Sequence, residues 1–160
     1  MTLDTVELDI CGALQTLIAA AIPSVQAPQP QQYPTAIDTV NGQPFAMTWP
    51  GNGDDWQKGA GYSQGTRTYR VLVFLDPVTQ SDIPSHAVAG MLLLRQFKNL
   101  FIKSVNTPLI NPGAFQATLE SGPDGGHMTD AGLVPTLAFG GRAWFGFELA
   151  IQVRWQGAQI

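Results

Sequence analysis

One serine of the chain lies in a pattern that can support nucleophilic catalysis. Residues 61–65 read Gly-Tyr-Ser-Gln-Gly, which matches the G-x-S-x-G turn that exposes a reactive serine between a strand and a helix. Ser63 instead follows a glycine-rich stretch and precedes a predicted strand, and the sequence places no base beside it. We therefore expect a plain loop around Ser63. A small serine hydrolase that uses Ser63 stays as an alternative function.

A second candidate for chemistry is a short run that could hold a metal ion. Asp124, His127 and Asp130 place two carboxylates and an imidazole within seven residues, a set that a lone metal could use. No third cluster completes a coordination shell, and aspartate and glycine are common in turns because of local hydrogen bonding. We therefore expect a turn here and no bound metal.

The remaining reactive side chains and glycine patterns also favour structural roles. Cys11 lies beside the apolar stripe of a predicted helix, where a thiol behaves as a small hydrophobic group. His86 has no cysteine or glutamate beside it and is expected at the surface. Glycines 59, 61 and 65 have the spacing G-x-G-x-x-x-G, which differs from a dinucleotide-binding loop. The sequence thus predicts no catalytic residue, no cofactor and no enzyme activity.

The composition indicates a protein whose surface is covered by partners. Of the 160 residues, 44% are apolar and only 12% are charged, about half of the usual charged fraction. The net charge of -4 argues against a nucleic-acid binder, because neutralising phosphates needs clustered lysine and arginine. The single cysteine allows no intrachain disulfide, the acidic start is unlike a signal peptide, and the apolar runs are too short to span a bilayer. We expect one domain over residues 1–160, outside any membrane.

The charges are divided unevenly along the chain. Residues 1–57 hold six acidic residues and no lysine or arginine, whereas residues 58–160 carry a net charge of +2. Three of the bases, Arg95, Lys98 and Lys103, stand close together. Such polarity suits head-to-tail contacts between subunits. Chance placement on a solvated surface is the alternative.

Hydrophobic periodicity and turn residues predict an α+β fold in which two main helices pack on a mostly antiparallel sheet. A proline-rich connector without regular hydrogen bonding follows the first helix, and Asn41-Gly42 predicts a hairpin. Residues 50–66 contain five glycines and are expected to form a long, mobile loop. The predicted helices cover residues 6–21 and 83–105, and the predicted strands cover residues 35–40, 44–49, 67–75, 115–120, 133–139 and 142–156.

The expected loop carries two large aromatic residues, Trp56 and Tyr62. Ordering a glycine-rich loop costs backbone entropy, so large buried groups are needed to anchor it against a neighbouring subunit or another partner. Trp56 is the expected anchor, because tryptophans at interfaces often contribute much of the binding energy. The alternative is that Trp56 folds back onto its own sheet as part of the core.

The predicted helix at residues 83–105 has two apolar faces. We expect one face to pack on the sheet; it comprises Ala89, Leu93, Leu94, Phe97, Leu100 and Phe101. The opposite face mixes large aliphatic with basic side chains, which a face turned only to solvent does not normally do. We interpret it as a subunit contact, with packing inside the monomer as the alternative. The expected contact comprises Val88, Met91, Leu92, Arg95, Lys98, Ile102 and Lys103.

The last predicted strand alternates between two faces. One face is continuously apolar and the other is mixed and includes Trp144, which is the pattern of a long strand that covers a core on one side. The apolar face comprises Phe145, Phe147, Leu149, Ile151, Val153 and Trp155.

The order of these elements resembles that of the tail terminator family of long-tailed bacteriophages. The shared features are an N-terminal helix, a proline-rich connector, a strand pair that ends in Trp-Pro-Gly at residues 49–51, and a glycine-rich loop. Residues 67–75, Arg-Thr-Tyr-Arg-Val-Leu-Val-Phe-Leu, are similar to the family's central strand. Residues 83–105 are similar to its long helix and residues 145–155 to its closing strand. The similarity spans nearly the whole chain and rests on element order and strand character.

This resemblance implies a structural virion protein rather than an enzyme. It implies a ring, usually of six subunits, that sits on the last ring of the tail tube, stops tube polymerisation and presents a surface for head attachment. The implied partners are further copies of the chain, the tail-tube protein and a neck or head-completion protein, with DNA passing through the lumen without specific binding. The implied location is the virion, after assembly in the host cytoplasm. A neck protein in the adjacent head-to-tail joining ring is the alternative.

Overall fold

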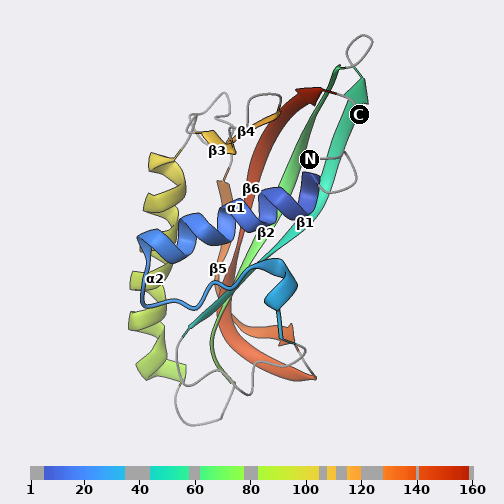
Figure 1. The fold of residues 1–160 in the computed structure, drawn as a ribbon. Helices are drawn as coiled ribbons and strands as arrows, with labels where there is room; N and C mark the ends of the chain where they lie inside the picture. The colour runs from blue at the N-terminus through green and yellow to red at the C-terminus, as the bar shows by residue number, and fades with distance from the viewer. Residues whose placement is uncertain are drawn as a thin grey trace.

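The computed structural model describes residues 6–34, 44–57, 62–77, 83–104, 108–110, 115–119, 128–139 and 141–158. These residues form two α-helices, one short 3-10 helix and six strands (Figure 1). The helices are α1 (Val6–Ala21), η2 (Pro30–Gln32) and α2 (Ile83–Lys103). The strands are β1 (Phe45–Gln57), β2 (Tyr62–Pro77), β3 (Pro108–Ile110), β4 (Phe115–Leu119), β5 (Met128–Phe139) and β6 (Arg142–Ala158).

The six strands belong to one sheet, and each pair of these strands is antiparallel. The order along the main path is β1-β2-β6-β4-β3. β6 pairs with β2 along one edge for nearly its whole length, whereas its other edge is shared between β5 and β4. The predicted α+β fold, with two helices packed on a mostly antiparallel sheet, is confirmed.

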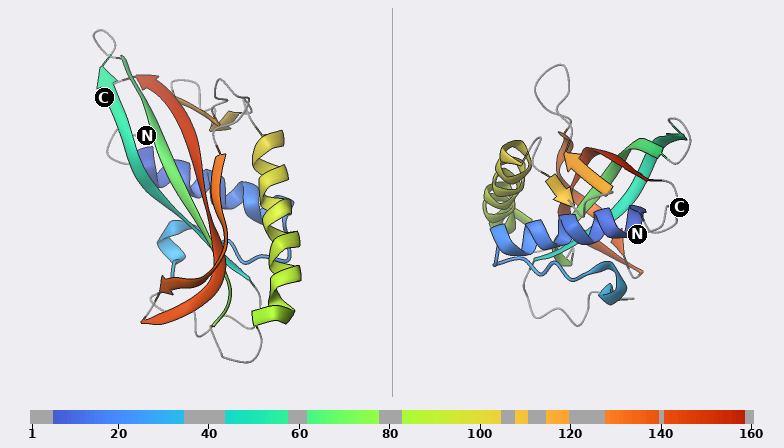
Figure 2. Two further views of the ribbon diagram at one scale, coloured as in Figure 1. Left: turned by 180° about the vertical axis from the view of Figure 1, so that it is seen from behind. Right: turned by 45° about the horizontal axis from the view of Figure 1, so that its top comes forward.

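Both α-helices pack on one face of the sheet, where α1 crosses the strands and α2 runs along one side (Figures 1 and 2). Their buried side chains meet alternate residues of β6, because successive side chains of a strand point to opposite faces. The apolar face predicted for the last strand is confirmed, since all six of its side chains are buried. This core includes Ile10, Leu14 and Ile18 of α1, Leu93, Phe97 and Phe101 of α2, and Phe147, Leu149, Ile151, Val153 and Trp155 of β6.

A smaller apolar cluster lies on the opposite face of the sheet. Phe74 of β2 packs against Phe139 and Trp144, with ring centroids 5.5 and 6.1 Å apart. Trp144 is buried, and its indole N–H donates to the carbonyl oxygen of Phe139 at 3.3 Å. The mixed face of β6 therefore has a buried aromatic residue near the start of the strand. The buried members of the cluster are Phe45, Met47, Phe74, Leu137 and Trp144.

The loop expected at residues 50–66 is wrong over most of its length. β1 continues to Gln57 and β2 begins at Tyr62, so the two strands form a long hairpin, and within it only residues 58–61 lie outside the described chain. In the hairpin, backbone N–H and C=O groups pair between β1 and β2, whereas in a loop they would bind water. The glycine content of the segment does not reveal this pairing.

The glycines of this hairpin allow close packing between β1 and β2. A Cβ atom on Gly53 would lie 2.6 Å from the Cβ atom of Arg67, and one on Gly51 would lie 2.8 Å from the carbonyl oxygen of Thr68. The pairing shifts register between Pro50 and Gly53, as at a β-bulge. Glycine at these positions makes room for the neighbouring strand.

Smaller differences concern the ends of two elements and one position on α2. α2 ends at Lys103, two residues before the predicted end, and β5 begins at Met128, five residues before the predicted start. Ala89, expected on the packed face, is exposed, and Gly90 is buried instead. The buried stripe of α2 runs through residues 90, 93, 97, 101 and 104, in steps of three and four that pass over Ala89.

The connector between α1 and β1 is hydrogen-bonded, in contrast to the expectation from its prolines. The Gln26 N–H donates to the carbonyl oxygen of Pro44, and the Gln26 carbonyl oxygen accepts from the Ala46 N–H, both at 2.8 Å. These bonds form a parallel bridge beside β1. The strand predicted at residues 35–40 and the hairpin predicted at residues 41–42 lie outside the described residues.

A buried glutamine joins α1 to this connector and to β1. Gln15 Nε2 donates to the carbonyl oxygens of Pro28 and Ala46, both at 2.8 Å, and Gln15 Oε1 accepts from Thr48 Oγ1 at 2.8 Å. The Tyr33 hydroxyl accepts from the Thr48 N–H at 2.8 Å and donates to the Thr48 carbonyl oxygen at 3.1 Å. Both polar atoms of the Gln15 side chain therefore have partners, which makes its full burial tolerable.

Replacing this glutamine with an apolar residue of similar length should destabilise the fold. Gln15→Met removes the glutamine side of three hydrogen bonds and leaves two carbonyl oxygens and the Thr48 hydroxyl short of a partner. We expect the free energy of unfolding to fall by about 3 kcal/mol. Urea unfolding measures it, with the exposed Gln31→Met as the control. Equal midpoints for the two variants would show that the network does not stabilise the protein.

Candidate functional site

α2 exposes the apolar and basic face that was predicted as a subunit contact. Its other face is buried in the core through Leu93, Phe97 and Phe101. Four large aliphatic side chains are more than half exposed: Val88 (68%), Met91 (63%), Leu92 (58%) and Ile102 (56%). Packing inside the monomer, the alternative interpretation, therefore does not hold for these four. The contact with another subunit stays a prediction.

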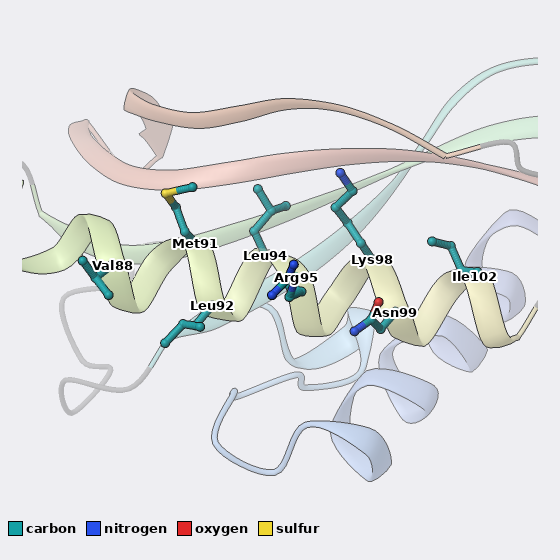
Figure 3. A pocket seen from close by; sticks show the side chains of 8 residues that line it. All are labelled: Val88, Met91, Leu92, Leu94, Arg95, Lys98, Asn99 and Ile102. Atoms are coloured by element: carbon teal, nitrogen blue, oxygen red, sulfur yellow. The ribbon is translucent and has the colours of Figure 1, made fainter.

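An open groove runs along this face of α2 (Figure 3). Its volume is about 530 Å³, and its described lining comes from α2. Met91, Leu94 and Lys98 project on the side of the helix that faces the strands in Figure 3. Leu92 projects away from them. We call this feature the α2 groove; its described lining is Val88, Met91, Leu92, Leu94, Arg95, Lys98, Asn99 and Ile102.

The charged side chains in the described lining of the α2 groove are basic. Arg95 is exposed and Lys98 is half-buried in the lining, whereas Lys103 is exposed at the end of the helix and does not line the groove. The described lining contains no acidic side chain. Burial of an aliphatic side chain contributes about 1.5–3 kcal/mol when it is complete, and charge complementarity adds mainly specificity. The groove is therefore suited to a partner surface that is apolar and acidic.

The aromatic pair predicted to anchor a loop lies in strands instead. Trp56 of β1 is opposite Gln64, and Tyr62 of β2 is opposite Ala158 of β6. The side chains of Trp56 and Tyr62 lie outside the described part of the structure, so their role as an anchor stays a prediction. Their hairpin extends past both helices at the top of Figure 1.

The serine of the G-x-S-x-G pattern lies within a strand. Ser63 belongs to β2, and its backbone is paired with Gln57 of β1 on one side and Gly157 of β6 on the other. A nucleophile at this type of motif requires a sharp turn from a strand into a helix. The backbone at Ser63 does not make such a turn, so the fold does not support the hydrolase alternative.

The possible metal ligands are only partly described. Asp130 lies in β5 opposite Leu149, whereas Asp124 and His127 lie outside the described residues. Within the described chain, no group of three or more histidine, cysteine, aspartate or glutamate side chains could hold a metal ion. His86 belongs to α2, and its predicted exposure at the surface is untested because its side chain is not described.

Burial keeps two ionisable groups near α1 protonated. Burial, with a smaller effect from the charge of Glu7, raises the pKa of the Cys11 thiol from 9.0 to about 12. Burial also raises the pKa of Tyr33 from 10.0 to about 12, although the hydrogen bonds with Thr48 oppose this rise. Cys11 thus stays a thiol at neutral pH and behaves as the buried hydrophobic group that was predicted.

Several surface residues were not found from the sequence. Leu94 packs against the core as predicted but is only partly buried, and it also lines the α2 groove, where it follows Met91 by three residues. That i, i+3 spacing was the signal for a shared face. Leu8 of α1 and Trp49 of β1 are exposed by 44% and 45%, and Trp49 packs edge-on against Tyr33 with ring centroids 5.3 Å apart. Single exposed apolar residues carry no periodic signal, so the sequence did not mark them.

Comparisons with known proteins assign no family to the chain: no family model matches it, and no curated protein matches it. Among the helices of the described chain, none combines the length and the hydropathy that are needed to cross a membrane. The α2 groove is thus the feature on which a functional interpretation can be built.

The raised pKa values predict a loss of stability at alkaline pH. Between about pH 9 and pH 12 the unfolded chain releases protons from Cys11 and Tyr33 while the folded chain retains them. The free energy of unfolding must therefore fall as the pH rises through this window, and below about pH 9 these groups add no pH dependence. Urea unfolding at a series of pH values measures how steeply the free energy of unfolding falls with pH. The double variant Cys11→Ala, Tyr33→Phe should show a shallower fall. An unchanged slope would contradict the raised values.

Proposed function

We propose that the chain is a structural subunit of a bacteriophage tail, which forms a ring that caps the tail tube, ends its polymerisation and offers a surface for head attachment. The α2 groove is the observation that carries this proposal, because it leaves four large aliphatic side chains and Arg95 exposed in the isolated chain. Apolar patches of this kind mark contacts with other macromolecules. The resemblance in element order to tail terminators supplies the biological setting.

A ring requires that one surface of each subunit contacts a different surface of the next subunit. The division of charge supports such a contact, since the first 57 residues carry only acidic charges and the remainder is net basic. The low fraction of charged residues further supports a protein that spends its working life covered by partners.

Introducing a charge into the α2 groove should weaken the ring. Met91→Lys places an ammonium group among the aliphatic side chains that a neighbour would bury, and Met91 is exposed, so the monomer should fold normally. We expect the dissociation constant of the ring to rise about tenfold to a hundredfold. Native mass spectrometry and negative-stain microscopy measure the ring. Gln96→Lys is the matched control, because Gln96 is exposed on the same helix and is absent from the described lining.

Wild-type chain that stays monomeric at every concentration, both alone and with tail tubes, would overturn the ring. Capping is tested separately by adding the chain to tubes that grow from the tail-tube protein of the phage that encodes it. A terminator binds a tube end and stops growth. A ring that leaves growth unchanged would instead identify a neck protein of the adjacent ring.

The proposal also predicts that Ser63 is dispensable. Ser63→Ala should leave ring formation and tube capping unchanged, because Ser63 is a residue of a paired strand without the turn that activates a nucleophile. Hydrolysis of an activated ester by the wild type, lost in Ser63→Ala, would contradict a purely structural role.

A further inference from the structure

We propose that the α2 groove binds the acidic first turn of α1 from a second copy of the chain. The inference rests on the proposed ring and names the two surfaces that join its subunits. The contact is head-to-tail: each copy contributes its groove to one neighbour and its α1 turn to the other.

The surface offered by α1 is acidic and apolar. Leu8 is 44% exposed and stands between Glu7 and Asp9, both of which are half-buried. Glu7 Oε1 lies 3.5 Å from Arg67 Nη2 of the same chain, so Glu7 has a partner on β2. Asp9 is therefore the carboxylate that we assign to the neighbour, together with the apolar side chain of Leu8.

Two further acidic residues of the sequence follow the partner of Arg67 in β1. Arg67, which contacts Glu7, pairs across the hairpin with Gly53 of β1. The next two residues of β1 are Asp54 and Asp55. The backbone of these two residues thus lies in the part of the hairpin that is next to Arg67, the partner of Glu7, whereas the groove carries Arg95 in its described lining.

These two surfaces cannot meet within one copy. The end of α1 at Ala21 lies beside α2, whereas its start lies beside β1 and β2 on the other side of the sheet's width (Figures 1 and 2). A helix of 16 residues is about 24 Å long, so α1 itself holds the acidic turn away from the groove. Two complementary surfaces on opposite sides of one subunit produce a head-to-tail contact, which closes into a ring or grows as a filament.

The charges also favour this contact over a symmetric contact, in which the grooves of two copies would face each other. If two grooves faced each other, the Arg95 and Lys98 side chains of both copies would be brought together, which is unfavourable in an interface. The acidic turn instead places Asp9 near these bases and Leu8 against the exposed aliphatic side chains. Charge therefore favours head-to-tail binding of a second copy over a symmetric pair of grooves. The complementary surface on the chain itself favours a second copy over an unrelated apolar partner.

Charge reversal on each side tests the contact. Arg95→Glu should block the groove and Asp9→Lys should block the α1 turn, and we expect each to raise the dissociation constant of the ring about tenfold or more. Gln96→Glu and Ala20→Lys are the matched controls, because both residues are exposed on the same two helices and lie outside the proposed contact. Circular dichroism and thermal unfolding check that all four variants fold.

Mixing the two blocked variants gives the decisive result. The Arg95→Glu chain keeps an intact α1 turn and the Asp9→Lys chain keeps an intact groove, and the two altered surfaces are themselves opposite in charge, so the mixture should form rings in which the two chains alternate, visible by native mass spectrometry. A chain that carries both substitutions has an acidic groove and a basic α1 turn, so opposite charges again meet between neighbours and rings should form again.

Three outcomes overturn the inference. Dimers of Asp9→Lys alone would show a symmetric contact between grooves. Rings that persist in both single variants while Arg95→Glu loses binding to tail tubes would assign the groove to the tube protein. Loss of the ring in Arg95→Glu without rescue by Asp9→Lys would place another surface of the neighbour in the groove. In each case wild-type rings still form, so the proposed function would survive; absence of wild-type rings is what refutes that function.

Discussion

The alternation of β6 is the constraint on which the rest of the structure depends. Its 17 residues pair with β2 on one edge and with β5 and β4 on the other, so a shift of β6 by one residue would move all its apolar side chains to the opposite face of the sheet. The register therefore decides that Phe147, Leu149 and Ile151 face both helices. The apolar face of β6 in turn receives one stripe of α2, so the opposite stripe is left exposed. The α2 groove is thus a consequence of sheet register.

A polar network, in addition to apolar packing, determines how α1 lies on this sheet. Gln15 bonds at once to the connector, through Pro28, and to β1, through Ala46 and Thr48. Apolar contacts are non-directional, so the buried stripe of α1 could slide on the core, whereas three hydrogen bonds from one side chain specify a position. Gln29 adds a second attachment, since its Nε2 donates to the Gly12 carbonyl oxygen at 3.2 Å and to Thr16 Oγ1 at 3.0 Å. The acidic turn of α1 is thereby held at a defined place on the surface.

The first turn of α1 is acidic and the α2 groove contains basic side chains, and the fold keeps these two surfaces apart. α1 lies across the strands with its acidic start near β1, and α2 carries its exposed bases on the far side. Facing copies of either surface would bring like charges together, which is why a head-to-tail assembly suits this molecule better than a symmetric dimer. The long hairpin of β1 and β2 projects beyond the helices. Aliphatic burial would supply the affinity, and charge would select the neighbour.

Local sequence patterns by themselves determined the two α-helices, the last strand and the α+β class. Burial of one face of a helix or strand requires apolar residues at the period of that element, so the spacing of apolar side chains identifies the element. The exposed aliphatic and basic face of α2 was also visible, since residues three and four apart share a helix face. Pairing across the chain decided the rest. Gly51 and Gly53 indicated a loop, yet both belong to β1, where they lie against Arg67 and Thr68 of β2. Gln15 interrupts the apolar stripe of α1, and its role is clear only from its hydrogen bonds to Thr48 and Pro28. Hydrogen-bond partners distant in the chain leave no periodic trace, so only the tertiary structure could decide these positions.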